Sequence, residues 1–321
     1  MSYTENYQKW LDFAELPAYL RDELVAMDEK TKEDAFYTNL EFGTAGMRGL
    51  IGAGTNRINI YVVRQATEGL AQLIDSKGEE AKKRGVAIAY DSRHFSPEFA
   101  FESAQVLAAH GIKSYVFESL RPTPELSFAV RHLHTFAGIM VTASHNPAPF
   151  NGYKVYGEDG GQMPPADADA LTDYIRAIEN PFTVQLADLE ESKASGLIEV
   201  IGENVDAEYL KEVKGVNINQ DLINEYGRDM KIVYTPLHGT GEMLARRALA
   251  QAGFEAVQVV EAQAVPDPDF STVKSPNPEN QEAFALAEEL GRKVDADVLV
   301  ATDPDADRLG VEIRQPDGSY L

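Results

Sequence analysis

Segments with strand and helix patterns alternate along most of this chain, and this alternation constrains the fold more than any other feature. Short apolar runs end in polar turns, and stretches with helical spacing of apolar residues follow them. The predicted strands are residues 86–90, 114–117, 136–143, 231–235, 255–260 and 297–302. The predicted helices are residues 59–77, 96–110, 123–133, 166–179, 241–252 and 280–293. Strands that alternate with helices favour mostly parallel sheets with helices outside.

We therefore predict an α/β fold of two consecutive domains, each a mixed, mostly parallel sheet with flanking helices. The 321 residues suffice for two domains with separate cores. Residues 1–40 are predicted to form an N-terminal helical extension, which Pro17 interrupts. Domain 1 is predicted to span residues 41–205, and domain 2 residues 206–321.

Composition narrows the class of protein. The net charge of −23 argues against nucleic acid or an anionic membrane as a partner, so the cations that bind a small anion must gather in a cleft. There is no cysteine, which excludes disulfides and thiolate metal sites. Apolar runs are too short to span a bilayer and the first residues do not resemble a secretion signal. We expect a cytoplasmic protein.

Two polar loops directly follow predicted strands. The first lies in VTASHNPAPFNGYKVYG (141–157), and the second in VLVATDPDADRLGVEI (298–313). Ligands of open α/β sheets bind beyond the carboxyl ends of the strands, which is where both loops lie. Our hypothesis is that the two loops meet over one metal ion and one phosphate.

The second loop carries three aspartates, Asp303, Asp305 and Asp307, at alternate positions. Carboxylates this close repel one another unless a cation lies between them, and a hard divalent cation prefers such oxygen ligands. An EF-hand is excluded, because its glycine and glutamate positions hold Arg308 and Arg314. Arg308 places a second positive charge beside a metal ion. That arrangement is costly unless an anion, such as phosphate, binds in the same site. A polar turn whose aspartates bind backbone donors stays open as the alternative.

The first loop offers Ser144, whose hydroxyl is expected at the ligand-binding edge of the sheet. A hydrolase nucleophile motif, G-x-S-x-G, is excluded by Thr142 and Asn146. His145 is adjacent in sequence, which is poor geometry for a base acting on Ser144. The alternative is a serine that caps the turn before Pro147.

Three further segments carry candidate groups. Lys154 has an ordinary pKa of about 10.4 and becomes a useful base only if burial or nearby cations lower that pKa; an ordinary surface lysine is the alternative. The glycine loop 42–49 is not a Walker A loop, yet it can bring backbone N–H groups and Arg48 to a phosphate. The turn 236–241, which contains His238, precedes a helix and can hold an anion there, or it is a plain strand-to-helix turn.

Together these stretches resemble the α-D-phosphohexomutase superfamily, and most of all its phosphoglucomutase branch, in the bacterial, phosphopentomutase-like group. The motifs occur in the family's order between residues 42 and 308, and the serine and aspartate motifs are the specific ones. The stretches that carry the resemblance are FGTAGMRG, YDSRHFS, TASHNP, NGYKVY, GGQ, PLHGTG, PNPE and TDPDADR.

The resemblance implies a phosphoserine enzyme that depends on Mg²⁺. It implies that Ser144 carries a phosphoryl group and that Mg²⁺ binds to one oxygen of that group and to the three aspartates. Lys154 and Arg48 match the family's acid/base and phosphate-stabilising positions. His145 matches a catalytic position beside the phosphoserine. The implied substrate-binding residues are Arg48, Ser144, Arg308 and His238.

The implied activity is the interconversion of glucose 1-phosphate and glucose 6-phosphate through a glucose 1,6-bisphosphate intermediate, which also acts as activator. The substrate is then a small sugar phosphate, with phosphopentomutase or phosphomannomutase activity as alternatives. Members of the family have four domains, and this chain resembles only the first two. The final residues, EIRQPDGSYL, resemble a hairpin with a short return strand. We therefore expect a two-domain fragment whose partners are the sugar-reading and distal-phosphate domains of the same enzyme. As an isolated chain it is expected to bind metal and phosphate with little or no turnover, or to lose phosphate slowly to water.

Overall fold

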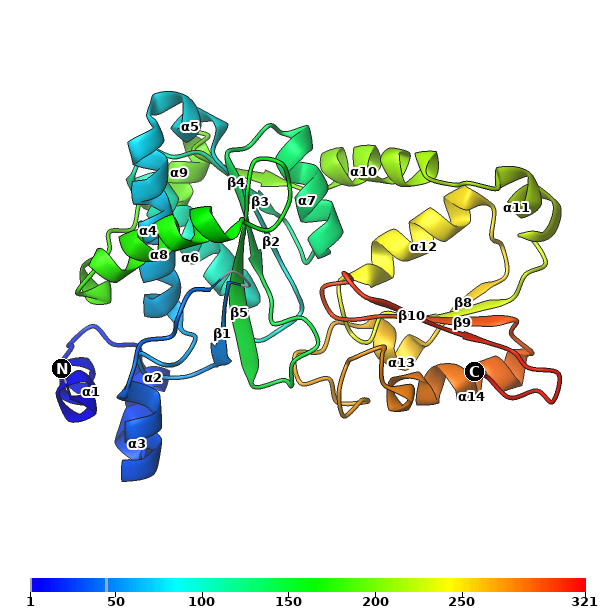
Figure 1. Ribbon diagram of the computed structural model, residues 1–321, viewed down its shortest axis with the longest axis horizontal. Helices are drawn as coiled ribbons and strands as arrows, with labels where there is room; N and C mark the ends of the chain where they lie inside the picture. Colours follow the sequence, from blue (N-terminus) through cyan, green and yellow to red (C-terminus); the bar gives the residue numbers. More distant parts are fainter. Residues whose placement is uncertain (1, 44–45) are drawn as a thin grey trace.

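Two sheets, each with helices packed beside it, form the body of the molecule (Figure 1). The computed structural model describes residues 2–43 and 46–321. The first sheet has six strands in the order β1-β5-β4-β2-β3-β6, and the second has four in the order β10-β9-β7-β8. The predicted class, two α/β sheets with flanking helices, is confirmed. None of the described helices combines the length and the apolar composition that crossing a membrane requires.

The strands of the first sheet are β1 Met47–Leu50, β2 Val86–Tyr90, β3 Ser114–Phe117, β4 Ala137–Val141, β5 Phe150–Tyr156 and β6 Ile198–Ile201. Those of the second sheet are β7 Ile232–Thr235, β8 Val257–Val259, β9 Val298–Thr302 and β10 Leu309–Ile313. The α-helices up to the end of the first sheet are α1 Tyr3–Leu11, α2 Ala18–Ala26, α3 Glu29–Phe36, α4 Ile60–Lys77, α5 Glu79–Arg84, α6 Ser96–Ala109, α7 Thr123–His132, α8 Pro165–Ala177 and α9 Leu189–Ala194. Those that follow are α10 Glu203–Gly215, α11 Gln220–Tyr226, α12 Gly241–Ala252, α13 Glu261–Ala264 and α14 Ala285–Val294, and two short 3₁₀ turns are η1 Pro181–Thr183 and η2 Gln281–Phe284.

The N-terminal helices α1, α2 and α3 form a small apolar cluster of their own. Trp10, Leu24 and Phe36 are buried in it together with Tyr61 of α4. Pro17 interrupts the helices as predicted, and a second break lies at Asp28, whose side chain accepts the backbone N–H of Thr31 at 2.8 Å. The helical character of the extension is therefore observed, while its boundary at residue 40 stays a prediction.

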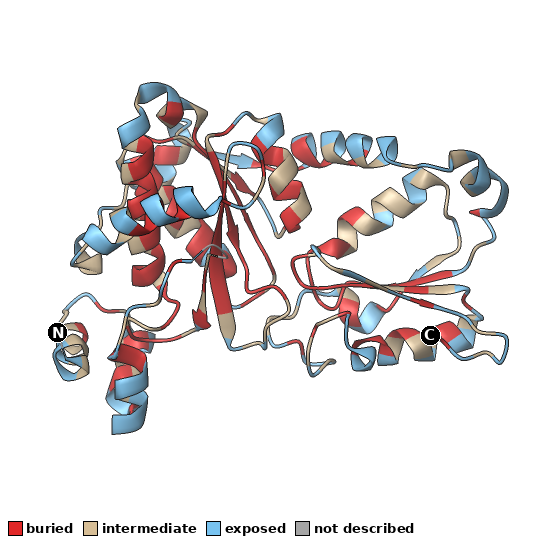
Figure 2. Ribbon diagram, viewed as in Figure 1, coloured by how far each residue is buried: buried red, intermediate tan, exposed pale blue. Residues whose placement is uncertain are grey.

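The four central strands of the first sheet and the four strands of the second repeat one arrangement. The order β5-β4-β2-β3 corresponds to β10-β9-β7-β8, with three parallel strands and one antiparallel edge strand in each set. All of β2 is buried, because α4 and α6 cover one face of the sheet and α7 the other (Figure 2). The loop from β4 to β5 and the loop from β9 to β10 therefore occupy equivalent places in the repeat.

The strand β5 is missing from the sequence-based prediction, which treated its residues only as a motif. It is enclosed on both faces and carries Lys154. The start of α6 also differs from the prediction by one residue. Ser96, which with Pro97 after it is predicted as the N-cap, is instead the first helical residue; Phe95 takes the cap position with φ 65°, and the Ser96 hydroxyl donates to the buried Asp91 at 2.8 Å.

The helix α10 connects the two sheets and contacts α7 on one side and α12 on the other (Figure 1). Arg121, before α7, donates from Nε and Nη2 to the two carboxylate oxygens of Asp206 in α10, each at 2.8 Å. Both residues are buried, so this two-pronged ion pair fastens the connection. The predicted domain boundary, between residues 205 and 206, falls inside α10 and stays a prediction.

Candidate active site

The serine loop, residues 142–149, connects β4 to β5. Ser144 lies three residues beyond β4, is fully buried and has φ 52°, in the left-handed region that costs an L-residue about 1–2 kcal/mol. Its backbone N–H donates to the hydroxyl of Thr142 at 2.8 Å. The local turn thus holds Ser144 in a conformation that turns its side chain toward the second sheet.

The aspartate loop, residues 303–308, makes the equivalent connection from β9 to β10. Its tight turn has Ala306 at φ 51°. The turn 236–241 contacts the aspartate loop, because the backbone N–H of Thr240 donates to the carbonyl of Pro304 at 2.8 Å. Gly239 lies so close that an added Cβ would be 2.4 Å from Pro304 Cα. Backbone contacts with the turn that follows β7 therefore help to fix this loop.

The two loops meet at Ser144. Its hydroxyl donates to Asp303 Oδ2 at 2.7 Å, although 159 residues separate the two in sequence. Arg308 Nη1 also contacts the Ser144 hydroxyl, and it donates to Asp307 Oδ1 at 2.9 Å. The predicted meeting of a serine hydroxyl with an acidic cluster is therefore present in the geometry.

Lys154 reaches the same cluster from β5. Its Nζ donates to Asp305 Oδ2 at 2.8 Å and lies 3.6 Å from Asp307 Oδ2. Thr123 donates from its hydroxyl to Asp305 Oδ2 at 3.0 Å and from its backbone N–H to the Asp305 carbonyl at 2.9 Å. Lys154 is only 3% exposed, so the alternative of an ordinary surface lysine is wrong.

Burial and charge act differently on the three buried ionisable groups. Burial, reinforced by the charge of Asp305, raises the pKa of Asp303 to about 7. Burial also acts to raise the pKa of Asp305, but the ammonium group of Lys154 outweighs it and holds that pKa below its ordinary value. Burial acts to lower the pKa of Lys154, and the charge of Asp305 outweighs it, so that pKa is raised. The lysine therefore rests in its protonated form, contrary to the lowered pKa that a resting base requires.

The acidic cluster fits a hard divalent cation. Asp303, Asp305 and Asp307 each offer a carboxylate oxygen within 4.8 Å of the others. Asp305 Oδ1 is buried and has no hydrogen-bond partner, which leaves one acceptor unsatisfied in the middle of the cluster. An all-oxygen set with an unsatisfied buried carboxylate oxygen is the kind of environment that Mg²⁺ prefers.

Arg48 and His145 border the serine loop. Arg48 Nη1 donates to the Asn146 side-chain oxygen at 3.3 Å, and His145 Nδ1 lies 3.3 Å from the Ser144 hydroxyl. Burial lowers the pKa of His145, and the charges of Arg308 and Arg48 lower it further. The neutral imidazole therefore lies beside the hydroxyl. Residues 44 and 45 of the predicted glycine loop lie outside the described residues.

His238 has other partners. Its Nδ1 lies 2.9 Å from the carbonyl of Val265, and its Nε2 lies 2.7 Å from the hydroxyl of Thr272. Both ring nitrogens are thus engaged within the second half of the chain, and the structure does not bring His238 to Ser144. A substrate-binding role for this residue stays a prediction.

None of the predicted site residues lies in YDSRHFS, yet Asp91 and Arg93 of this stretch contact the serine loop. Asp91 accepts the Thr142 hydroxyl at 2.7 Å, and Arg93 donates to the carbonyl of Ser144 at 2.5 Å. Two charged residues directly after a buried strand were the signal in the sequence. Such residues must find partners at the carboxyl edge of the sheet.

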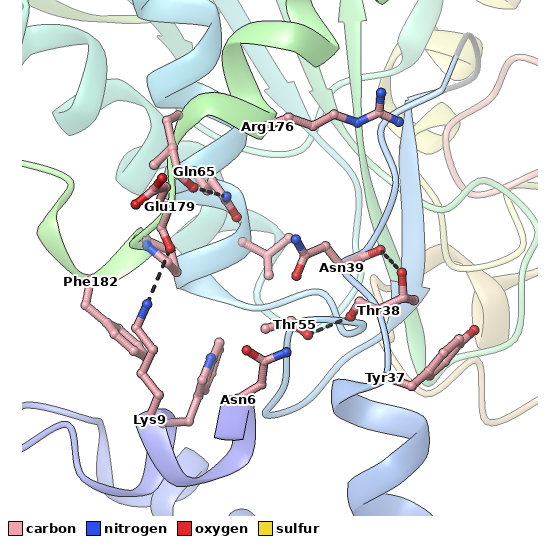
Figure 3. Close-up of a pocket in the computed structure, with 14 residues that line it drawn as sticks. Asn6, Lys9, Tyr37, Thr38, Asn39, Thr55, Gln65, Arg176, Glu179 and Phe182 are labelled. Carbon is pink, nitrogen blue, oxygen red and sulfur yellow. Dashed lines mark hydrogen bonds between the residues drawn. The ribbon is translucent and has the colours of Figure 1, made fainter. Parts of the chain in front are cut away.

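A cavity of about 580 Å³ lies elsewhere, between α1 and the helices α4 and α8 (Figure 3). Asn6 and Lys9 of α1 border one end of it and Arg176 of α8 the other, and Lys9 Nζ donates to the carbonyl of Glu179 at 3.3 Å. None of the predicted site residues lines this cavity. The chemistry therefore concentrates where the two loops meet, away from this cavity.

Comparison with known proteins agrees with the two-domain division. Residues 39–182 match the family model for phosphoglucomutase/phosphomannomutase, alpha/beta/alpha domain I. Residues 207–315 match the model for alpha/beta/alpha domain II of the same family. Together the two matches cover well over half of the chain.

Curated relatives carry the name phosphoglucomutase. The phosphoglucomutase of Staphylococcus epidermidis is 40% identical over 311 residues, which are 97% of this chain and 55% of the relative. That of Staphylococcus haemolyticus is 41% identical over 305 residues, which are 94% of this chain and 54% of the relative. The chain therefore spans about half the length of the curated relatives that it matches.

Solved structures share the fold. A protein of Thermus thermophilus, proposed to be a phosphomannomutase, has a TM-score of 0.72 at 26% identity over 88% of this chain and 58% of that chain. A phosphoglucomutase/phosphomannomutase family protein of Burkholderia thailandensis has a TM-score of 0.66 at 22% identity over 88% of this chain and 56% of that chain, a likeness of fold alone. Sequence, fold and family models agree, and the chain belongs to the phosphoglucomutase/phosphomannomutase family.

Proposed function

We propose that this chain supplies the phosphoserine and metal-binding loops of a phosphoglucomutase, which interconverts glucose 1-phosphate and glucose 6-phosphate. The observation that carries the proposal is the 2.7 Å contact between the buried Ser144 hydroxyl and Asp303, in a cluster that also holds the buried Asp305 and Lys154 and the more exposed Asp307 and Arg308. Packing a buried serine does not require three carboxylates and two cations around it. Transfer of a phosphoryl group does need such charges, because positioning and charge neutralisation dominate that reaction.

The proposed transfer begins with a phosphoryl group on Ser144. A hydroxyl oxygen of the sugar phosphate forms a bond to phosphorus, the bond from phosphorus to the Ser144 oxygen breaks, and the sugar hydroxyl gives up its proton. The sugar bisphosphate then presents its other phosphate and the reverse transfer restores phosphoserine. Because Lys154 rests protonated, we assign it the role of donating a proton to the serine oxygen as that oxygen leaves, and the proton released by the sugar hydroxyl restores its ammonium group.

Cations on two sides of Ser144 are proposed to stabilise the phosphoryl group. Arg308 contacts the hydroxyl directly, and Arg48 borders the loop through Asn146. His145, neutral beside the hydroxyl, is proposed to contribute a hydrogen bond to the phosphoryl oxygens. The arginine side chains present fixed forks of donors, which suit the tetrahedral phosphate group.

Mg²⁺ is the proposed metal, held by Asp303, Asp305, Asp307 and one oxygen on Ser144. When bound, Mg²⁺ would draw negative charge from the phosphoryl oxygens and from the leaving serine oxygen. The unsatisfied Asp305 Oδ1 supports this assignment, because a ligand set without a cation leaves a buried acceptor unused.

Glucose as the sugar is supported by the names of the staphylococcal relatives at 40% and 41% identity. Mannose is the alternative that the assignment of the Thermus thermophilus protein suggests, and phosphopentomutase activity remains the other alternative. Glucose 1,6-bisphosphate is proposed as the activator that first loads Ser144. A cytoplasmic location remains our expectation.

For the 321-residue chain alone we propose a narrower activity, namely the binding of metal and phosphate with transfer of a phosphoryl group to Ser144 and little or no turnover. The chain spans 55% of the Staphylococcus epidermidis relative, and sugar recognition in the family is expected from the remaining part. Slow loss of the phosphoryl group to water would be the residual reaction of an open site.

Incubation of the chain with glucose 1,6-bisphosphate and Mg²⁺, followed by intact mass and peptide mapping, tests the proposal. We expect one added phosphoryl group, located at Ser144, and none in the Ser144→Ala variant. An unmodified Ser144 after this incubation would contradict the proposed function. A coupled assay for glucose 6-phosphate tests the second point, and steady turnover by the isolated chain would contradict the narrower activity.

A further inference from the structure

We propose that Arg93 is a positioning residue that holds the Ser144 backbone in place, and that Phe270 of the second half of the chain holds Arg93. The inference rests on the proposed function, since it names what orients the serine for phosphoryl transfer. Neither residue is hydrogen-bonded to the carboxylates of the proposed metal ligands, and neither is among the predicted site residues.

Arg93 is the support of the whole serine loop. One guanidinium group donates to four backbone carbonyls of this loop and of the first residue of β5. Nη2 donates to the carbonyls of Ser144 and Asn146, each at 2.5 Å, and Nη1 donates to those of Pro147 at 3.0 Å and Phe150 at 2.9 Å. These carbonyls face the side chain of Arg93, which is only 2% exposed. A planar fork with several donors can satisfy such a cage, whereas the single ammonium of lysine cannot.

Asp91 fixes the guanidinium from the other side. Its Oδ2 lies 3.2 Å from Arg93 Nε and accepts the Thr142 hydroxyl at 2.7 Å, while its Oδ1 accepts the Ser96 hydroxyl at 2.8 Å. The Thr142 hydroxyl in turn accepts the backbone N–H of Ser144. The carbonyl of Ser144 is thus bound to Arg93, and its N–H is linked to Asp91 through the Thr142 hydroxyl. These two contacts account for the left-handed backbone of Ser144.

Phe270 contacts Arg93 from the second half of the chain. The guanidinium carbon lies 4.9 Å from the centre of the Phe270 ring, and the ring is buried. Cations attract the face of an aromatic ring, and the attraction grows when water is excluded. His94, next to Arg93, also reaches this segment, with Nε2 2.8 Å from Asp269 Oδ1.

The segment that carries Phe270 is tied to the aspartate loop's own support. His238 contacts Val265 and Thr272, which lie on either side of Phe270. The same turn holds Pro304 through Thr240. A single turn, residues 236–241, thus fastens the aspartate loop directly and the serine loop through Phe270 and Arg93. We infer that this chain of contacts sets the separation between the Ser144 oxygen and the aspartates.

Two variants and one matched control test the inference. Arg93→Lys keeps the charge but removes the fork, and Phe270→Leu keeps apolar volume but removes the ring. Arg84→Lys is the control, because Arg84 also donates to two loop carbonyls, of His134 and Thr135, and also lies over an aromatic ring, that of Phe136, but away from the site. Each purified chain is loaded with glucose 1,6-bisphosphate and Mg²⁺ in a single turnover, and phosphorylation of Ser144 is followed by mass.

We expect Arg93→Lys to slow phosphorylation about 100-fold, the cost of displacing a reacting group by about 1 Å. Phe270→Leu should slow it less, and the double variant no more than Arg93→Lys alone, because both changes act through one contact. The dissociation constant of Mn²⁺ should rise by less than about tenfold in every variant, because the three aspartate ligands are unchanged and only the Ser144 oxygen is displaced. A lysine variant that is phosphorylated at the wild-type rate would overturn the inference.

Hydrogen exchange provides the second readout and does not depend on activity. Amides of residues 144–150 should exchange roughly tenfold faster in Arg93→Lys, and to a smaller extent in Phe270→Leu, with β2 unchanged and the Arg84→Lys control at the wild-type rate in this segment. If the wild-type chain takes up no phosphate, the proposed function fails while faster exchange still upholds the positioning role. Equal exchange in wild type and both variants would overturn that role, whatever the activity. Should Arg93→Lys fail to fold, Phe270→Leu alone decides.

Discussion

The serine loop and the aspartate loop occupy equivalent places in a repeated arrangement of strands. Each follows the last parallel strand of its set, each precedes the antiparallel edge strand, and each holds a non-glycine residue with positive φ, Ser144 at 52° and Ala306 at 51°. Their supports differ: a buried arginine holds the serine loop, whereas backbone contacts with the turn 236–241 hold the aspartate loop. The repeat thus sets where each loop lies, while a different support holds each loop in place.

The strands that follow the two loops differ in burial. Val155 of β5 pairs with the third residue of β4 and is 1% exposed, whereas Val311 of β10 pairs with the third residue of β9 and is 47% exposed. In the first sheet α8 shares a core with β4 and β5. Among the residues that the structure describes, no helix follows β10. Burial of the antiparallel strand is therefore a separate property from the geometry of the loop before it.

Removing one carboxylate of the aspartate loop should have the largest effect. Asp305→Asn takes a charge from the proposed metal site and a partner from Lys154, so we expect Mn²⁺ affinity to fall by more than about tenfold. Titration calorimetry measures the change. Asp221→Asn, at an exposed position of α11, is the control, and equal affinities for the two variants would contradict a metal site at the aspartates.

The backbone support of the aspartate loop can be tested at Gly239. A Cβ there would lie 2.4 Å from Pro304 Cα and 2.6 Å from the Pro304 carbonyl oxygen. Gly239→Ala should therefore lower the free energy of unfolding by about 1–3 kcal/mol. Gly215→Ala, at the end of α10 with no atom within 4 Å of its Cβ, should leave that free energy unchanged or raise it slightly. Equal denaturant midpoints for the two variants would show that the loop is not held this tightly.

The burial contrast between β5 and β10 predicts unequal costs for one substitution. Val155→Thr places a hydroxyl in a closed core, and we expect it to cost about 1–3 kcal/mol of unfolding free energy. Val311→Thr exposes its hydroxyl to water and should change that free energy by less than about 0.5 kcal/mol. Urea unfolding of both variants provides the measurement, and a cost at Val311 as large as that at Val155 would mean that β10 is covered in solution.

A smaller, pH-dependent effect is expected on the side of the first sheet that faces away from the site. A hydrogen bond to Glu68 raises the pKa of His110. Partial burial acts to lower that pKa, but a second hydrogen bond, to Asp75, also raises it, and the pKa is about 9. A raised histidine pKa stabilises the fold fully below the ordinary value of about 6.5, and this contribution is lost as pH rises through about 9. His110→Gln should therefore lose up to about 1 kcal/mol at pH 6 and almost nothing at pH 10. A loss of equal size at both pH values would contradict the charged pairing.

Much of the fold could be predicted because the strands and helices near the site follow simple patterns. The strands at 86–90 and 114–117 and the helix at 241–252 have the predicted bounds. The strand β5 was missed because FNGYKVY mixes Asn151, Gly152 and Lys154 with apolar residues, and only the surrounding structure shows why each is enclosed. Gly152, for example, lies against two backbone carbonyls and leaves no room for a side chain.

The site was partly predictable for a similar reason. Ser144 and the aspartates lie at strand ends, where α/β sheets bind ligands, so local patterns identify them. Arg93 and Phe270 depend on a contact between segments far apart in the chain, which no local pattern contains. His238 had a suggestive place before a helix, yet its ring turns toward Val265 and Thr272. Tertiary contacts, rather than spacing, decided these cases.

A crystal structure of the chain with Mn²⁺ bound tests the central claim most directly, because anomalous scattering locates the ion. We predict one ion within about 2.0–2.3 Å of carboxylate oxygens from Asp303, Asp305 and Asp307, and of the Ser144 hydroxyl or a phosphoryl oxygen on it. An ion held by the three aspartates while the Ser144 oxygen lies well beyond its reach would contradict the claim that the two loops share one cation.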